Sequence, residues 1–193
     1  MLKIGLTGGI GSGKTTVAKV FKQLRIPVYL SDDRAKALML DNESLKQSII
    51  RLFGEHSYVD GVLNRSYIAS KVFVNQEELN KLNELVHPIV QKDFEAWCLA
   101  QNSPYLIKEA AILFESGAHK GLDQIILVEA PKELKISRVV QRDGVTPEAV
   151  ITRMDRQWSD EKKREHSDHV IRNDEKSSLL EQVLKLHDVF SDQ

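Results

Sequence analysis

The sequence contains the stretch Gly8-Gly9-Ile10-Gly11-Ser12-Gly13-Lys14-Thr15, which fits the pattern G-x-x-x-x-G-K-[ST] of phosphate-binding loops. A phosphate chain must lie against backbone N–H groups, and side chains at the glycines would hold it away. The N-terminus of a following helix adds partial positive charge. We therefore expect Lys14 to reach the β and γ phosphates of a nucleotide, and the Thr15 hydroxyl to bind Mg²⁺.

The residues on both sides of this loop predict the setting that the pattern requires. Leu2–Thr7 is a short apolar run typical of a buried strand, and Ile26–Leu30 is a second one. Between the loop and the second run, apolar residues recur at the spacing of one helix face: Val17, Val20, Phe21 and Leu24. Strand, glycine loop, helix and strand in this order open a parallel α/β fold.

The rest of the chain predicts how this opening is completed. Residues 35–100 have a mostly helical pattern, with a turn signal at Asp60-Gly61. The elements expected after them are strands Tyr105–Phe114, Gln124–Glu129 and Asp168–Arg172, a helix opened by Pro131 and a helix Leu179–Phe190. The prediction is a three-layer α/β fold with a five-stranded parallel sheet.

The composition excludes several other classes of protein. The chain has 27 basic and 28 acidic residues, so no overall field attracts nucleic acid or an anionic membrane. The single cysteine, Cys98, excludes an intrachain disulfide, suits a reducing compartment and is expected to be an apolar filler. No apolar run approaches the roughly 20 residues that span a bilayer, so we expect a cytoplasmic protein.

Two other nucleotide-binding classes are disfavoured. The dinucleotide fingerprint G-x-G-x-x-G fails because Lys14 stands where its third glycine should follow Gly9 and Gly11. A GTPase is disfavoured because the chain lacks D-x-x-G. In addition, Asn80-Lys81-Leu82-Asn83 ends in Asn where guanine recognition needs Asp.

The acidic pair Asp32 and Asp33 stands just past the end of the second predicted strand. Ligands of open parallel sheets bind beyond the carboxyl ends of the strands. A carboxylate there could accept the proton of an acceptor hydroxyl or hold a water of Mg²⁺. The alternative is that Ser31, Asp32 or Asp33 caps a helix that begins near Ala35. The residues alone favour neither interpretation.

Two arginines four residues apart, Arg138 and Arg142, share a helical face after the fourth predicted strand. They suit a mobile lid that closes over phosphates, and the alternative is a solvated helix. We expect Lys162-Lys163-Arg164 to be a solvated run. His87-Pro88 is interpreted as either a helix boundary or a substrate contact.

The order and spacing of several motifs make the chain resemble the dephospho-coenzyme A kinase family from end to end. The motifs are I-G-L-T-G-G-I-G-S-G-K-T-T-V-A, I-P-V-Y-L-S-D-D-R-A-K, L-N-R, K-V-F, N-E-L-V-H-P-I-V, A-I-L-F-E-S-G, Q-R-D-G-V-T and D-H-V-I-R-N-D. The resemblance implies transfer of the ATP γ-phosphoryl group to the ribose 3′-hydroxyl of dephospho-CoA, the last step of coenzyme A biosynthesis. It implies ATP and Mg²⁺ as cofactors, and no nucleic acid, membrane or obligatory protein partner.

The resemblance also implies a single P-loop kinase domain and the residues of its site. The expected parts are a core of residues 1–34 and 103–193, a helical CoA-binding insertion at about 35–102 and a lid at about 138–164. The catalytic residues would be Lys14, Asp32 as the base and Arg142 from the lid. The nucleotide would be bound by Gly9, Gly11, Ser12, Gly13, Lys14, Thr15, Thr16, Arg138 and Asn173, with Thr15 on the metal. Dephospho-CoA would be bound by Asp32, Arg65, His87 and Glu115.

The sequence departs from the family pattern at two places. The usual D-x-D after the second strand reads Leu30-Ser31-Asp32, which weakens a two-carboxylate mechanism and keeps Asp32 as a single base. The usual V-P-L-L-x-E reads Ala110–Glu115 without its proline, so the strand geometry beside Glu115 is expected to differ slightly. The rival hypotheses are a kinase for another small acceptor, such as a nucleoside monophosphate, and an ATP-dependent switch that acts on a protein partner.

Overall fold

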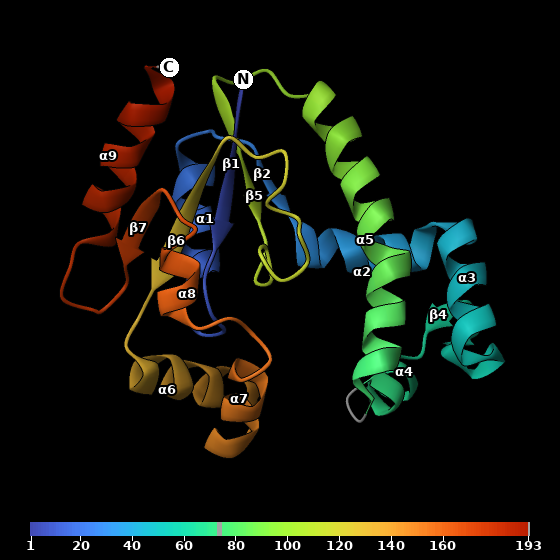
Figure 1. The fold of residues 1–193 in the computed structure, drawn as a ribbon. Helices are drawn as coiled ribbons and strands as arrows, with labels where there is room; N and C mark the ends of the chain where they lie inside the picture. Colours follow the sequence, from blue (N-terminus) through green and yellow to red (C-terminus); the bar gives the residue numbers. More distant parts are fainter. Residues whose placement is uncertain (73–74, 193) are drawn as a thin grey trace. The chain divides into compact units, whose positions relative to one another are not determined.

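The computed structural model describes residues 1–72 and 75–192, and the chain forms two compact units (Figure 1). One unit comprises Met1–Leu30 with Gln101–Gln193, and the other comprises Ser31–Ala100. The glycine loop therefore belongs to the first unit, and Asp32 to the second. Phe73, in the motif K-V-F, lies outside the described residues.

The first unit is built on a five-stranded parallel sheet with the strand order β2-β5-β1-β6-β7. Its strands are β1 (Leu2–Thr7), β2 (Val28–Leu30), β5 (Tyr105–Glu109), β6 (Gln124–Glu129) and β7 (His169–Arg172). The expected five-stranded parallel sheet is thus confirmed. Because β1 lies in the middle, the loop after it leaves the sheet at the centre of the edge where ligands of such sheets bind.

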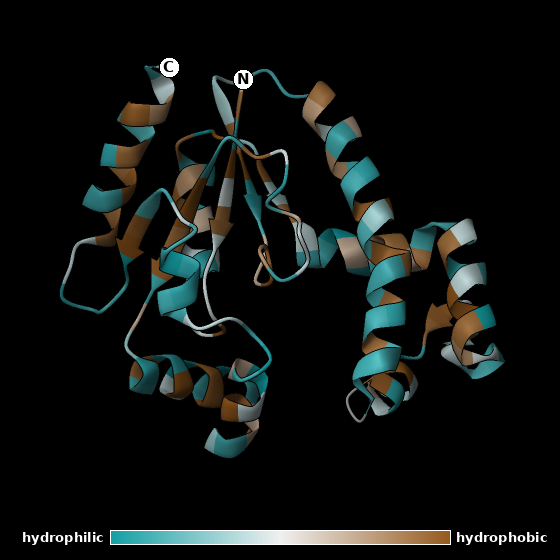
Figure 2. Cartoon of the chain, in the orientation of Figure 1, coloured by the Kyte–Doolittle hydropathy of each residue, from teal (hydrophilic) through white to brown (hydrophobic). Residues whose placement is uncertain are grey.

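Apolar side chains line the sheet, as the mostly brown colour of β6 and β7 shows in Figure 2. On one face, α1 (Lys14–Gln23) and α9 (Leu179–Ser191) bury Phe21, Val183 and Phe190. The apolar spacing that predicted α1 is therefore the spacing that packs it on the sheet.

The strand β2 is shorter than its apolar run, and begins at Val28 instead of Ile26. Arg25 takes the left-handed conformation, with φ 62°, and the Ile26 N–H donates to the Phe21 carbonyl at the end of α1. Ile26 therefore closes the helix, and the Pro27 carbonyl oxygen accepts the Ile107 N–H of β5 at 2.9 Å just before β2 begins.

The strand β5 is also shorter than expected, because it ends at Glu109 and residues 111–121 form consecutive turns. Leu113 and Phe114 are buried in these turns, in a cluster with Ile125 of β6. The apolar character that predicted a longer strand thus comes from packing on the second face of the sheet.

The charged stretch after β6 folds as three short helices, α6 (Lys132–Asp143), α7 (Pro147–Met154) and α8 (Asp160–Arg164). The Thr146 hydroxyl caps α7, and the Ser159 hydroxyl caps α8 by accepting a backbone N–H. The helix expected to open at Pro131 is α6, with Pro131 at its N-cap.

The second unit is mainly helical, as its sequence pattern predicted. Its helices are α2 (Ser31–Asp41), α3 (Glu43–Phe53), α4 (Arg65–Val72) and α5 (Gln76–Leu99), with a 3₁₀ turn at Glu55–Ser57. The side-chain oxygens of Asn42 and Asn75 accept backbone N–H groups at the starts of α3 and α5. Cys98 is buried at the end of α5, which fits the expected apolar filler.

A small hairpin interrupts these helices. β3 (Tyr58–Val59) and β4 (Val62–Leu63) pair antiparallel around Asp60-Gly61, whose φ angles are 51° and 79°. Two successive left-handed residues form the two-residue turn that Asp-Gly favours. The sequence pattern predicted the turn, and the hairpin that it joins was missed.

Candidate functional site

Gly11 and Gly13 give the glycine loop a path that other residues would block. Their φ angles are 78° and 93°, in the left-handed region. A Cβ at Gly11 would lie 2.4 Å from the Lys135 carbonyl oxygen, and one at Gly13 would lie 2.0 Å from Asn173 Nδ2. The loop backbone therefore passes close to both neighbours, with no side chain between it and a phosphate.

Lys14 is the first residue of α1 and is only 8% exposed. Its Nζ donates to the carbonyl oxygens of Gly8 at 2.9 Å and Gly9 at 3.4 Å. The ammonium thus lies across the loop at a helix N-terminus, where the helix dipole and the charge both favour an anion. Thr15 and Thr16, which follow, are exposed.

Arg138 and Asn173, both expected at the nucleotide, meet beside this loop. Asn173 Nδ2 donates to the Ser12 carbonyl oxygen at 2.8 Å. Arg138 Nη2 donates to the Asn173 carbonyl oxygen at 3.2 Å and to Glu175 Oε1 at 3.1 Å. Arg138 Nη1 is buried without a hydrogen-bond partner among the described residues, so a polar ligand group there would satisfy it.

Three further side chains reach the loop that sequence reasoning missed. Gln157 Oε1 accepts the Ile10 N–H at 2.9 Å. Lys135 Nζ pairs with Asp160 Oδ2 at 2.6 Å, and this pair lies beside Gly9. Gln157 and Asp160 lie in the stretch 138–164 that was expected to form a lid, and Lys135 lies before it, in the helix expected to open at Pro131.

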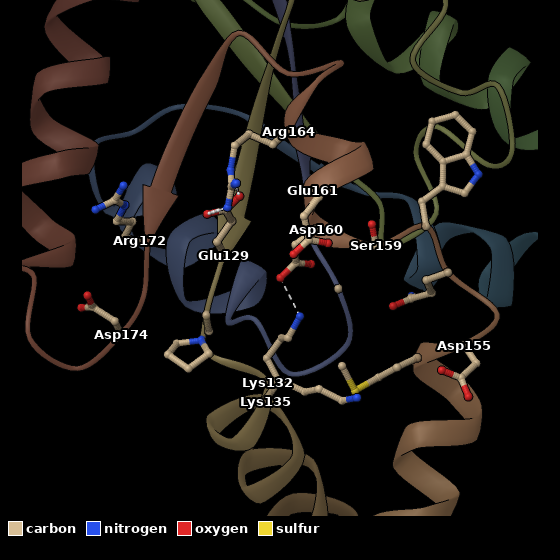
Figure 3. Close-up of a pocket in the computed structure, with 16 residues that line it drawn as sticks. Glu129, Lys132, Lys135, Asp155, Ser159, Asp160, Glu161, Arg164, Arg172 and Asp174 are labelled. Carbon is tan, nitrogen blue, oxygen red and sulfur yellow. Dashed lines mark hydrogen bonds and ion pairs between the residues drawn. The ribbon is translucent and has the colours of Figure 1, made fainter.

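A cavity of about 720 Å³ opens beside the loop, and charges of both signs line it (Figure 3). Its lining charges are Glu129, Lys132, Lys135, Asp155, Asp160, Glu161, Arg164, Arg172 and Asp174. Arg164 donates to both carboxylate oxygens of Glu129, at 2.7 and 2.8 Å. Arg164 and Lys135 are therefore each paired with a carboxylate of the same wall.

Glu115 forms a buried ion pair with Lys163, which corrects the expected solvated run. The Lys163 side chain is fully buried, and its Nζ lies 3.0 Å from Glu115 Oε1 and 2.9 Å from the Ala111 carbonyl oxygen. Glu115 Oε1 also accepts the Trp158 N–H at 2.8 Å. Glu115 thereby joins the turns after β5 to Trp158 and to Lys163 of α8.

Arg142 stands apart from these contacts. It lies in the last turn of α6, its side chain is 64% exposed, and it pairs with Asp143 at 2.7 Å. The hydrogen bond from Arg142 holds the pKa of the Asp143 carboxyl below its ordinary value. Arg142 is not among the described residues that line the cavity, in contrast to its helix neighbour Lys135.

Asp32 and Asp33 occupy the first turn of α2, which begins at Ser31 directly after β2. The helix expected to begin near Ala35 therefore starts four residues earlier, and neither carboxylate is an N-cap. The reason is that the chain enters the helix as soon as it leaves the sheet. Both side chains are exposed, and Asp33 pairs with Lys36 at 3.0 Å.

Arg65 and His87 lie in the second unit with Asp32. Arg65 is the exposed first residue of α4 and lines a cavity of about 490 Å³ beside the hairpin. His87 is half-buried within α5, directly before Pro88, so the pair is not a helix boundary.

Comparisons with known proteins identify the family and the fold of this chain. The sequence profile of the dephospho-CoA kinase family matches residues 2–178. A dephospho-CoA kinase of Bacteroides fragilis is 36% identical over 186 residues, which cover 96% of this chain and 91% of that protein. A solved structure from Thermus thermophilus has a TM-score of 0.86 at 35% identity, covering 97% of this chain and 96% of that one.

A dephospho-CoA kinase structure from Campylobacter jejuni has a TM-score of 0.71 at 26% identity, covering 98% of this chain and 97% of that one. The similarity extends over both compact units, and the resemblance noted in the sequence is confirmed. The chain belongs to the dephospho-CoA kinase family, with the P-loop kinase fold.

Proposed function

We propose that this protein transfers the γ-phosphoryl group of ATP to the ribose 3′-hydroxyl of dephospho-CoA and so forms coenzyme A. The observation that carries the proposal is Lys14, folded across a glycine loop at the start of α1 in a chain of this family. The family makes ATP the phosphoryl donor. A preorganised cation at such a loop stabilises charge on the transferring group.

The chemistry follows from the roles proposed for three side chains. The 3′ oxygen of the acceptor attacks the γ phosphorus, a new P–O bond forms, and the bond to the β–γ bridging oxygen breaks to release ADP. The Asp32 carboxylate, exposed in the first turn of α2, takes the hydroxyl proton. Lys14 stabilises the charge on the transferring group, and Arg142 contributes from the lid.

The residues at the loop fit Mg²⁺ bound together with a nucleotide. Nowhere in residues 1–72 and 75–192 do three His, Cys, Asp or Glu side chains gather as a metal site. Mg²⁺ commonly keeps several waters and binds substrate phosphates, so it needs few protein ligands. The exposed Thr15 hydroxyl suits one of these protein ligands, and the bound ion would neutralise phosphate charge.

Acceptor selection is assigned to the second unit, with Arg65 and His87 as its proposed contacts and Glu115 as a third from the first unit. Residues 31–100 form a compact unit of their own, and Arg65 lines a cavity in it. An arginine there suits the pyrophosphate of dephospho-CoA.

The stretch 138–164 is proposed as the lid, and the cytoplasm as the place of action, where ATP is supplied. In the described part of the chain, no helix has the length and apolarity to cross a bilayer.

A coupled ADP-release assay with dephospho-CoA, AMP, CMP and shikimate tests the function. We expect the highest kcat/KM with dephospho-CoA and one phosphorylated acceptor for each ATP consumed. A better rate with AMP would favour a kinase for another acceptor. Release of free phosphate with no phosphorylated acceptor would favour an ATP-dependent switch.

A further inference from the structure

Lys135 lies against the glycine loop with both its backbone and its side chain. Its carbonyl oxygen lies 2.4 Å from the position of a Cβ on Gly11, so α6 touches the loop there. Its Nζ lies 3.4 Å from the position of a Cβ on Gly9, and Asp160 Oδ1 lies 3.3 Å from the same point. The Lys135–Asp160 pair therefore sits directly on the loop that binds phosphate.

This ion pair is buried, which makes it an expensive feature if it serves structure alone. The Lys135 side chain is 7% exposed and that of Asp160 is 15% exposed. Removing two charges from water costs free energy that their attraction often fails to recover, and apolar side chains would fill the space as well. A buried pair beside a ligand site is more readily explained by a ligand that one partner binds.

Two side-chain oxygens reach the loop from the same short segment, Gln157–Asp160. Gln157 Oε1 accepts the Ile10 N–H, and Asp160 Oδ2 accepts from Lys135. Figure 3 shows the Lys135 ammonium pointing at Asp160 across the cavity wall. The Ile10 N–H and the Lys135 ammonium thus each donate to a side-chain oxygen. Two oxygens of one phosphate group could accept from the same two donors.

We propose that Lys135 is a second phosphate-binding lysine, which exchanges Asp160 for the terminal phosphate of ATP. The inference rests on the proposed function, because it needs a nucleoside triphosphate on the loop. A terminal phosphate carries more negative charge than one carboxylate and is also held by the loop N–H groups, so it competes with Asp160 for the ammonium. Asp160 keeps the buried ammonium paired between turnovers.

The test compares the binding of a non-hydrolysable ATP analogue with that of ADP by calorimetry, at constant Mg²⁺ and without acceptor. Lys135→Gln should lose on the order of tenfold or more in affinity for the ATP analogue, the scale of one charge-assisted hydrogen bond, and change little toward ADP. Asp160→Asn keeps the ammonium and removes its competitor, so the affinity for the ATP analogue should be equal or higher.

The double variant Lys135→Gln/Asp160→Asn separates binding from folding, because it leaves no unpaired buried charge. It should regain thermal stability lost by the single variants and keep the reduced preference for the ATP analogue. Lys132→Gln is the matched control: Lys132 is an exposed lysine one turn earlier on α6 and lines the same cavity. Its ratio of affinities should equal that of the unmodified protein.

The inference would be overturned if the ratio of the affinities for the ATP analogue and ADP were unchanged in both Lys135→Gln and the double variant. The Lys135–Asp160 pair would then be purely structural. Failure of the proposed function would look different. The chain would then not phosphorylate dephospho-CoA, while the ratio of nucleotide affinities would still report on Lys135.

Discussion

At the scale of single residues, the loop combines one buried ammonium with a helix N-terminus. Lys14 is 8% exposed, so little water screens its charge. The Asn173 amide and Gln157 hold the loop backbone from two sides, through Ser12 and Ile10. The loop is therefore preorganised, which is the condition for electrostatic stabilisation of a transition state.

Lys14→Ala should keep the fold and lose on the order of 10²-fold or more in kcat, the scale of removing one preorganised electrostatic contact. Steady-state kinetics measure the loss, and circular dichroism checks the fold. Near-normal turnover would contradict the assignment of the loop as the phosphate site.

Asp32→Asn should lower kcat by roughly 10²–10⁴-fold, the contribution of a general base, with ATP affinity unchanged. Asp33→Asn is its matched control, because both residues lie exposed in the first turn of α2. Within residues 1–72 and 75–192, Asp33→Asn would weaken the interaction with the helix N-terminus and the ion pair with Lys36, together worth about a few tenths of a kcal/mol. The opposite pattern of kinetic effects would make Asp33 the base.

At the scale of elements, buried polar contacts join segments that are far apart in the sequence. The Glu115–Lys163 pair links the turns after β5 to α8, and Trp158 donates to the same carboxylate. In the second unit, the Tyr58 hydroxyl links β3 to α2, because it donates to the Met39 carbonyl oxygen at 2.7 Å.

Lys163→Met should lower the free energy of unfolding by about 3–5 kcal/mol, because Glu115 is left buried without its counter-ion. Urea unfolding measures the loss. Lys163→Met/Glu115→Gln should lose less than Lys163→Met, since the uncompensated charge is gone. The control is Lys162→Met, at an exposed neighbour, for which an equal loss would rule out the burial explanation.

Tyr58 predicts a loss of stability at alkaline pH. Burial, and secondarily Glu43, raises the pKa of the Tyr58 hydroxyl from 10.0 to about 12. Between these values the unfolded chain ionises while the folded chain stays protonated, so the stabilisation is full below pH 10 and falls as the pH rises toward 12.

Thermal unfolding of Tyr58→Phe should show a shallower fall of stability from pH 10 to 12 than the unmodified protein. At neutral pH the variant should lose about 1 kcal/mol with its hydrogen bond. Tyr67→Phe removes a similar bond, to the Phe53 carbonyl oxygen, and controls for that neutral loss. Identical alkaline slopes in Tyr58→Phe and the unmodified protein would disprove the assignment.

At the scale of the whole molecule, donor recognition is proposed for the first unit, and acceptor recognition for the second unit together with Glu115 of the first. The loop, proposed to contact the nucleotide donor, belongs to the unit Met1–Leu30 with Gln101–Gln193. Acceptor choice must come from other residues, and Arg65 and His87 lie in the unit Ser31–Ala100.

Arg65→Ala and His87→Ala should raise KM for dephospho-CoA by on the order of tenfold, as expected for loss of a charge-assisted contact, and change KM for ATP much less. Initial rates with each substrate varied in turn measure both constants. Arg51→Ala, at an arginine in the last turn of α3 of the same unit, is a control for loss of positive charge. If the variants change only thermal stability, both residues are structural.

The sequence by itself determined the glycine loop, its flanking strand and helix, and the parallel α/β class. Those features depend on residues within a few positions of one another, where glycine conformation and apolar spacing are read directly. The acidic turn after β2 was located in the same way, although its helix begins earlier than expected. The local signal failed where an apolar run served packing instead of pairing, as in residues 111–121.

Only the tertiary structure decided which charges are buried and which meet the loop. Asn173 and Ser12 are 161 positions apart, and Lys135 and Asp160 are 25 apart. Lys163 stands between two exposed basic neighbours and is fully buried, whereas Arg142 shares a helix with Lys135 and is exposed. The physical reason is that strand order and helix packing bring these groups together or separate them, and neither is encoded in the identity of neighbouring residues.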